Sequence, residues 1–184
     1  MRRAAIFPLI LLVLCLGAGA AFSDHGDKDR KRERHQEGRG LGEYQVPTVN
    51  NPLYKEQCGA CHMAYQPALL PAASWGKILA LLPEHFGDQV DLSPQDRAAL
   101  NAYLTANAAE SCGCKISRKI LKSLGGGVPL RISQLPYILH KHEDDDIPAG
   151  AFERKAVGSR GNCKACHPTA EQGQYDDDLV RIPR

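Results

Sequence analysis

The 184-residue sequence has few aromatic side chains: tryptophan, tyrosine and phenylalanine together make up 6% of it. Aromatic rings bury a large apolar area per residue, so their scarcity excludes an extensive hydrophobic core. The length fits one domain or two small ones. We therefore expect a disulfide, a metal or a cofactor to complete the interior.

The sequence also lacks an excess of charge of one sign, because 23 basic and 21 acidic residues give a formal net charge of +2. Arg2 and Arg3 precede an apolar run that ends in Ala18-Gly19-Ala20, a pattern typical of a cleaved export signal over residues 1–20. A membrane anchor is the alternative, but the run is barely long enough to span a bilayer. Cleavage leaves a net charge near zero, which argues against binding to nucleic acid or to a membrane surface.

Residues 21–43 lack the apolar side chains that a folded segment needs. The stretch SDHGDKDRKRERHQEGRGLGE within it mixes acids and bases and contains one large apolar residue. Such a segment cannot offset its own ordering entropy, which predicts a disordered leader. We interpret His25 and His35 as polar residues of this leader.

Cysteine, in contrast, is present in an informative arrangement: four of the seven cysteines lie in CGACH (58–62) and CKACH (163–167). Two thiols at this spacing can each add to one vinyl group of a haem, and the adjoining histidine then binds the iron. The sequence therefore predicts two covalent haems, held on one side by His62 and His167. The thiols predicted to form the thioether bonds are Cys58, Cys61, Cys163 and Cys166.

A zinc site, a redox dithiol and a chance match are the alternative interpretations of the two motifs. Zinc sites and dithiols also use Cys-x-x-Cys, but neither requires a histidine directly after the second cysteine. At the frequencies of this sequence, one accidental match has a probability on the order of 1% and two on the order of 0.01%. Two haems are the favoured interpretation.

Methionine, another common axial ligand of haem iron, is nearly absent. Met1 belongs to the expected signal, and Met63 directly follows a proximal histidine, so it cannot reach the other face of the same haem. The strong ligands that remain for the sixth positions are His85, His140 and His142.

His85 lies in the stretch SWGKILALLPEHFGDQ, whose large apolar residues recur at helical spacing. Pro83 interrupts this pattern, which predicts a helix break followed by a new turn. A hydrogen-bonded core histidine is the alternative. We favour iron ligation for His85, because the chain offers few other ligands and histidine is the commonest metal ligand.

The segment PYILHKHE places His140 and His142 on different faces of a predicted helix. His142 continues the i, i+3, i+4, i+7 apolar spacing that begins at Leu135, whereas His140 points about 100° away from it. Pro136 suits a first helical turn, and Ser133 is a candidate cap. Burial against a haem is therefore predicted for His142 and not for His140.

The stretch between the two motifs contains a helix start, a cysteine pair and a glycine run. Ser93 and the following Pro94 predict the start of a packing helix. Cys112 and Cys114 could bond to each other, pair with another chain or stay free. Residues 125–127 are all glycine and are interpreted as a helix terminator that joins two haem-bearing halves.

Several segments resemble the bacterial dihaem cytochrome c family, over roughly residues 44–184. They are CGACHMAYQPALLPAASW, HFG, NAYLTANAA, PYILHKHE, NCKACH and the terminal RIP. The resemblance implies a mainly α fold, with a small cytochrome c-like N-terminal haem domain and a less regular helical C-terminal haem region. We place these at residues 44–110 and 128–184, joined by a connector at 111–127.

The resemblance further implies a periplasmic electron carrier with two bis-histidine haems. His85 matches the distal histidine after the first motif and His142 the one before the second, although a crossed arrangement is conceivable. Implied partners are a small oxygen-binding monohaem cytochrome or a membrane-bound oxidoreductase. The mature protein is expected to have no membrane span and no enzymatic activity.

Two other functions are compatible with the motifs. A peroxidase-like enzyme would need one open iron, and the chain is short for that class. A small electron-transfer subunit of a periplasmic reductase would remain in complex with a large catalytic partner. Carbon monoxide binding and co-purification, respectively, distinguish these functions from a simple carrier.

Overall fold

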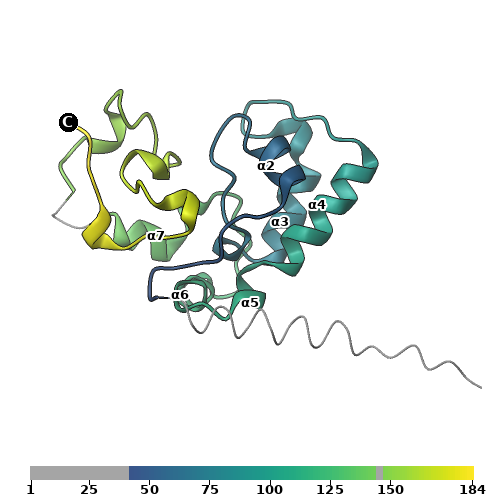
Figure 1. The fold of residues 1–184 in the computed structure, drawn as a ribbon, viewed down its shortest axis with the longest axis horizontal. Helices are drawn as coiled ribbons and strands as arrows, with labels where there is room; N and C mark the ends of the chain where they lie inside the picture. Colours follow the sequence, from purple (N-terminus) through teal and green to yellow (C-terminus); the bar gives the residue numbers. More distant parts are fainter. Residues whose placement is uncertain (1–41, 144–146) are drawn as a thin grey trace, which may run out of the picture.

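The structure, a computed structural model, describes residues 42–143 and 147–184. The expected signal and nearly all of the expected leader lie outside these residues. The described chain consists of helices and 3₁₀ turns without a β-strand (Figure 1), which confirms the predicted mainly α class. None of its helices is long and apolar enough to cross a membrane.

Most of the regular helix lies in the first part of the described chain. The helices are α2 (Pro52–Cys58), α3 (Ala72–Ala80), α4 (Pro94–Ala106), α5 (Ala109–Cys112), α6 (Lys115–Leu124) and α7 (Pro136–Lys141). The first short 3₁₀ turns are η1 (Pro67–Leu69), η2 (Leu82–Glu84) and η3 (Ile132–Gln134). After α7 only four further turns follow: η4 (Ala151–Glu153), η5 (Cys163–Ala165), η6 (Ala170–Gln172) and η7 (Asp177–Leu179).

Helix α4 begins where the sequence predicts it. The Ser93 hydroxyl accepts a hydrogen bond from the backbone N–H of Asp96 at 3.0 Å, and Pro94 occupies the first helical position. The first N–H groups of a helix have no acceptor within the helix. The Ser93 hydroxyl accepts from one of them, and Pro94 has no N–H to satisfy. Leu100 and Leu104 are buried where α4 packs against α3, and this contact forms one side of the core.

Helices α5 and α6 are joined at the cysteine pair. Cys112 and Cys114 form a disulfide and are both buried, which resolves the three alternatives that the sequence left open. Helix α6 ends at Gly125, whose φ of 54° and the φ of 89° at Gly126 lie in the left-handed region that glycine adopts without strain. The predicted helix terminator is therefore confirmed.

Helix α7 begins later than the proposed cap suggested. Its N-cap is Leu135, which has no side-chain cap bond, and Ser133 lies in the preceding turn η3. The prediction of a Ser133 cap was wrong, because a residue before proline is driven to extended backbone, and Leu135 adopts φ −63° and ψ 130° before Pro136.

Two segments near the ends of the described chain lie side by side. The Val46 N–H donates to the Gly173 carbonyl at 2.9 Å, and the Tyr175 N–H donates to the Tyr44 carbonyl at 2.9 Å. A Cβ at Gly173 would lie 2.2 Å from the Val46 carbonyl oxygen, so only glycine allows this approach. We call this pairing of residues 44–46 with 173–175 the terminal clasp.

Candidate haem sites

The first site pairs His62, from the CGACH motif, with His85. Helix α3 ends at Ala80 and the turn η2 follows, so Pro83 marks the predicted break and His85 comes directly after it. The ring centroids of His62 and His85 lie 6.2 Å apart with an interplanar angle of 24°. The structure thus brings together the predicted proximal and distal histidines, which are separated in the chain by η1, α3 and η2.

The second site pairs His167, from the CKACH motif, with His142. Their ring centroids lie 6.1 Å apart with an interplanar angle of 73°. His142 is half-buried at the C-cap of α7, whereas His140 is exposed. The pairing in the structure is direct, with His85 beside the first motif and His142 beside the second, and not crossed.

Each separation suits one metal ion between two imidazoles. Half of either centroid distance is about 3 Å, and a nitrogen turned toward the midpoint would lie about 2 Å from it, the usual metal–imidazole bond length. No group of three or more His, Cys, Asp or Glu side chains suited to a metal ion occurs in the described residues. The paired rings therefore suit a metal that brings its own equatorial ligands, as a haem does.

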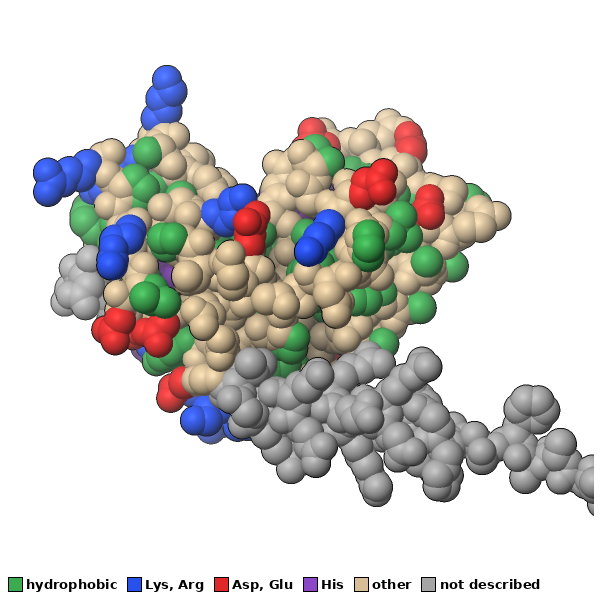
Figure 2. Space-filling model, in the orientation of Figure 1, with side chains coloured by type: hydrophobic (Ala, Val, Ile, Leu, Met, Phe, Trp, Pro, Cys, Tyr) green, Lys and Arg blue, Asp and Glu red, His purple; other side chains and the backbone are tan. Residues whose placement is uncertain are grey.

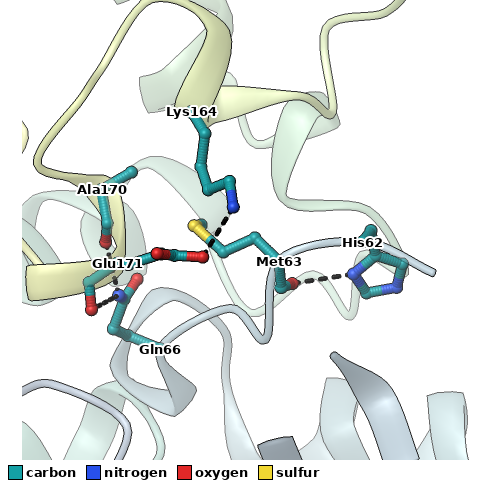
Figure 3. Close-up of polar contacts among 6 residues, drawn as sticks. All are labelled: His62, Met63, Gln66, Lys164, Ala170 and Glu171. Atoms are coloured by element: carbon teal, nitrogen blue, oxygen red, sulfur yellow. Dashed lines mark hydrogen bonds and ion pairs between the residues drawn. The ribbon is translucent and has the colours of Figure 1, made fainter. Parts of the chain in front are cut away.

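In two of the four histidine rings, the Nδ1 atom is hydrogen-bonded to a backbone carbonyl. His62 Nδ1 donates to the Met63 carbonyl at 2.8 Å (Figure 3), and His142 Nδ1 donates to the Ile138 carbonyl at 2.7 Å. These bonds put the proton on Nδ1 and leave the lone pair on Nε2 available to a metal. The Met63 side chain points away from the His62 ring in Figure 3.

Burial favours the neutral form of the other two histidines. It lowers the pKa of His85, and the neighbouring His62 adds to that lowering. Burial likewise lowers the pKa of His167, with His142 as the second cause. A neutral imidazole is the form that binds a metal, so the surroundings of both rings favour ligation.

The four motif cysteines are not joined in disulfides. Burial raises the pKa of Cys58 and of Cys163 to about 11, which disfavours the thiolate form of both side chains. A redox dithiol requires an accessible thiolate with a lowered pKa, and these surroundings have the opposite effect. These surroundings therefore argue against a redox dithiol at either motif.

Both sites open into one continuous cavity of about 1450 Å³. Pockets for a single drug-sized ligand have volumes of roughly 300–1,000 Å³, so this cavity has room for two large cofactors. Its lining includes all four motif cysteines and the four paired histidines. Figure 2 shows the molecule hollowed between its two lobes, with acidic and basic side chains near the notch.

Polar contacts join the surroundings of the two sites. The Tyr65 hydroxyl donates to the Gly161 carbonyl at 2.5 Å, and the Tyr65 ring lies 5.1 Å from His62. The buried Gln66 amide donates to the Ala170 carbonyl at 2.6 Å (Figure 3) and its oxygen accepts from Tyr175 at 2.6 Å. The chain after the first motif is therefore bonded to the chain around the second.

The sequence did not single out these contacts. Gln66 is completely buried although glutamine is usually exposed, and no periodicity marks it. Tyr175 packs its ring 5.6 Å from His167. The one available signal was position, because Tyr65 and Gln66 follow His62 closely and Tyr175 follows His167.

A sequence model of the dihaem cytochrome c family matches residues 54–175. The chain is similar to the solved structure of a dihaem cytochrome c from Rhodobacter sphaeroides, with 42% identity over 71% of this chain and 100% of that one, and a TM-score of 0.63. It is also similar to a dihaem cytochrome c from Shewanella baltica, with 37% identity over 72% of this chain and 93% of that one, and a TM-score of 0.59. No curated protein matches the chain.

The family match spans both attachment motifs. Two haems, the cofactors of that family, fit a cavity lined by two pairs of motif cysteines and two pairs of histidines. Two c-type haems are thus the cofactors of this chain, as the motifs predicted. The chain belongs to the dihaem cytochrome c family.

Proposed function

We propose that the chain carries electrons between redox proteins through two bis-histidine haems, one between His62 and His85 and one between His142 and His167. The single observation that carries the proposal is the pair of imidazole separations, 6.2 Å and 6.1 Å. With both axial positions filled, an iron changes valence with little ligand movement and has no open position for a substrate.

Each part of the chain has a distinct task. When bound, the haems supply irons that accept and release one electron. Cys58, Cys61, Cys163 and Cys166 form the thioether bonds. The carbonyls of Met63 and Ile138 hold the rings of His62 and His142 in the tautomer that presents Nε2.

The expected export signal and the oxidised Cys112–Cys114 pair support a periplasmic location, because c-type haem is attached and disulfides form outside the cytoplasm. Redox proteins are the partners that family membership implies. A small oxygen-binding monohaem cytochrome and a membrane-bound oxidoreductase are the two classes that we propose.

Low-temperature electron paramagnetic resonance of the oxidised holoprotein tests the ligation. Two low-spin signals and no high-spin iron are expected. The reduced protein should bind no carbon monoxide on mixing. Rapid stoichiometric binding at one haem would contradict the carrier and favour an enzyme with one open iron.

A further inference from the structure

Two arginines occupy matching surroundings, one at each site. The Arg131 Cζ lies 3.8 Å from the centroid of the Phe86 ring, and the Arg160 Cζ lies 4.3 Å from that of Phe152. Each phenylalanine in turn contacts the distal histidine of its site. The centroid distances are 4.8 Å from Phe86 to His85 and 5.9 Å from Phe152 to His142.

The sequence does not explain this repeated order of histidine, phenylalanine and arginine. In the first site Phe86 directly follows His85, and Arg131 comes from the distant segment before η3. In the second site Phe152 lies in η4, and Arg160 precedes the CKACH motif. Two unrelated stretches of chain thus arrive at the same arrangement, which indicates a shared requirement of the two cofactors.

Arg131 and Arg160 both line the cavity. Within residues 42–143 and 147–184, neither guanidinium group makes an ion pair or a hydrogen bond, whereas Lys164 pairs with Glu171 at 2.7 Å and Lys141 contacts the Tyr44 hydroxyl. A guanidinium has five donors in a fixed fork that matches a carboxylate. Arg131 and Arg160 are therefore cations at the cavity wall without an anion from the described chain.

The charge of Arg131 acts on both sides of the first site. Its guanidinium contacts Phe86 on the His85 side. Its charge also acts on Tyr65, which packs against His62: burial raises the pKa of Tyr65 to about 12, and Arg131 opposes that rise. Arg131 also opposes the positive charge on His85, and it lines the cavity that holds both rings.

The backbone at Phe86 adds a further observation. Its φ of 58° is the only positive value at a non-glycine residue in the described chain, and its side chain is 44% exposed. The left-handed region is unfavourable for an L-residue that has a Cβ atom. Strain of this kind persists where a functional arrangement requires it, and the contacts that Phe86 makes are with His85 and Arg131.

A haem has two propionate carboxylates at one edge, which are the anions missing from both arginines. We propose that Arg131 and Arg160 bind haem propionates, one arginine at each haem, and that each raises the reduction potential of the haem it binds. The inference rests on the proposed function, because it assumes a haem between each pair of histidines. Phe86 and Phe152 hold the guanidinium groups in place by stacking.

The test uses Arg131→Gln and Arg160→Gln in the holoprotein, with two midpoint potentials measured by spectroelectrochemical titration. Loss of a positive charge beside a propionate favours the oxidised iron. We expect each substitution to lower a different one of the two potentials. At a fixed electrode potential the ratio of oxidised to reduced haem should rise about threefold, a shift of about 30 mV for a one-electron couple.

Arg97→Gln is the matched control, because it removes the same charge from α4 at a residue that does not line the cavity. Arg131→Lys keeps the charge and should retain most of the wild-type potential. Shifts no larger than that of Arg97→Gln, or an equal shift of both potentials in each variant, would overturn the proposal.

Electron paramagnetic resonance of the same samples separates this proposal from the bis-histidine ligation. Two low-spin signals with unshifted potentials would reject the arginine role alone, whereas a high-spin signal in the wild type would reject the ligation. Where Arg131→Gln yields no holoprotein, Phe86→Leu removes the stacking partner. It should lower the same single potential by less, and unchanged potentials would again reject the proposal.

Discussion

His140 and His142 are separated by one residue and have different surroundings. The His142 ring faces His167 and is oriented by the Ile138 carbonyl, whereas His140 is exposed. We expect His142→Ala to open one iron and to replace one low-spin resonance by a high-spin signal. His140→Ala is the matched control and should leave both signals intact. A changed spectrum in the control, or two intact signals in His142→Ala, would contradict the assignment.

Gln66 is a second residue whose effect can be measured. Its amide is completely buried and bonds to the Ala170 carbonyl and the Tyr175 hydroxyl. Gln66→Leu keeps the approximate volume but leaves both partners unsatisfied, so we expect the free energy of unfolding to fall by about 1–3 kcal/mol. Denaturant unfolding of the holoprotein, followed by circular dichroism, measures the loss. Gln95→Leu, at an exposed position of α4, should change stability little.

At the scale of single residues, sequence reasoning singled out all four histidines that the structure brings together. The two attachment motifs marked His62 and His167, and the scarcity of other ligands left His85 and His142. Their role as ligands stays a prediction. The stacking of Arg131 on Phe86 was not foreseeable, because it joins residues far apart in the chain and neither belongs to a motif.

Among the elements, α4 has the clearest local determinants. Ser93→Ala removes the acceptor for the Asp96 N–H, so we expect a loss of about 1 kcal/mol in the free energy of unfolding. Gln95→Ala, in the same first turn, is exposed and serves as the control. A loss as large in the control as in Ser93→Ala would mean that the cap does not stabilise the helix.

The sequence predicted a helix boundary where residues at that boundary fix the backbone themselves. The start of α4, the break at Pro83 and the end of α6 at Gly125 all depend on residues that fix the backbone locally. The turns after α7 have no periodic apolar face to predict them. They are held by contacts with distant parts of the chain, such as the bond from Gln66 to Ala170.

At the scale of the whole molecule, the Tyr65 hydroxyl bonds the region of the first site to that of the second. Tyr65→Phe removes the bond to the Gly161 carbonyl and keeps the ring beside His62. We expect the free energy of unfolding to decrease by about 0.5–1.5 kcal/mol.

Tyr137→Phe is a sensitive control for this change. The Tyr137 hydroxyl is one of two buried side-chain polar atoms in the described residues without a hydrogen-bond partner. Its removal should be neutral or slightly stabilising, since no bond is lost. Equal destabilisation by both substitutions would show that the Tyr65 bond makes no specific contribution. Denaturant unfolding measures both variants.

The terminal clasp has a consequence for how the protein matures. Residues 44–46 and 173–175 enclose both attachment motifs between them in the sequence. The clasp therefore closes a very long loop, and it cannot form until residues 173–175 have been made. Helices such as α4 can form earlier, since contacts between residues close in sequence form fastest. The order of events that follows is early folding around the first motif, arrival of the second motif, and closure of the clasp as a late step of assembly.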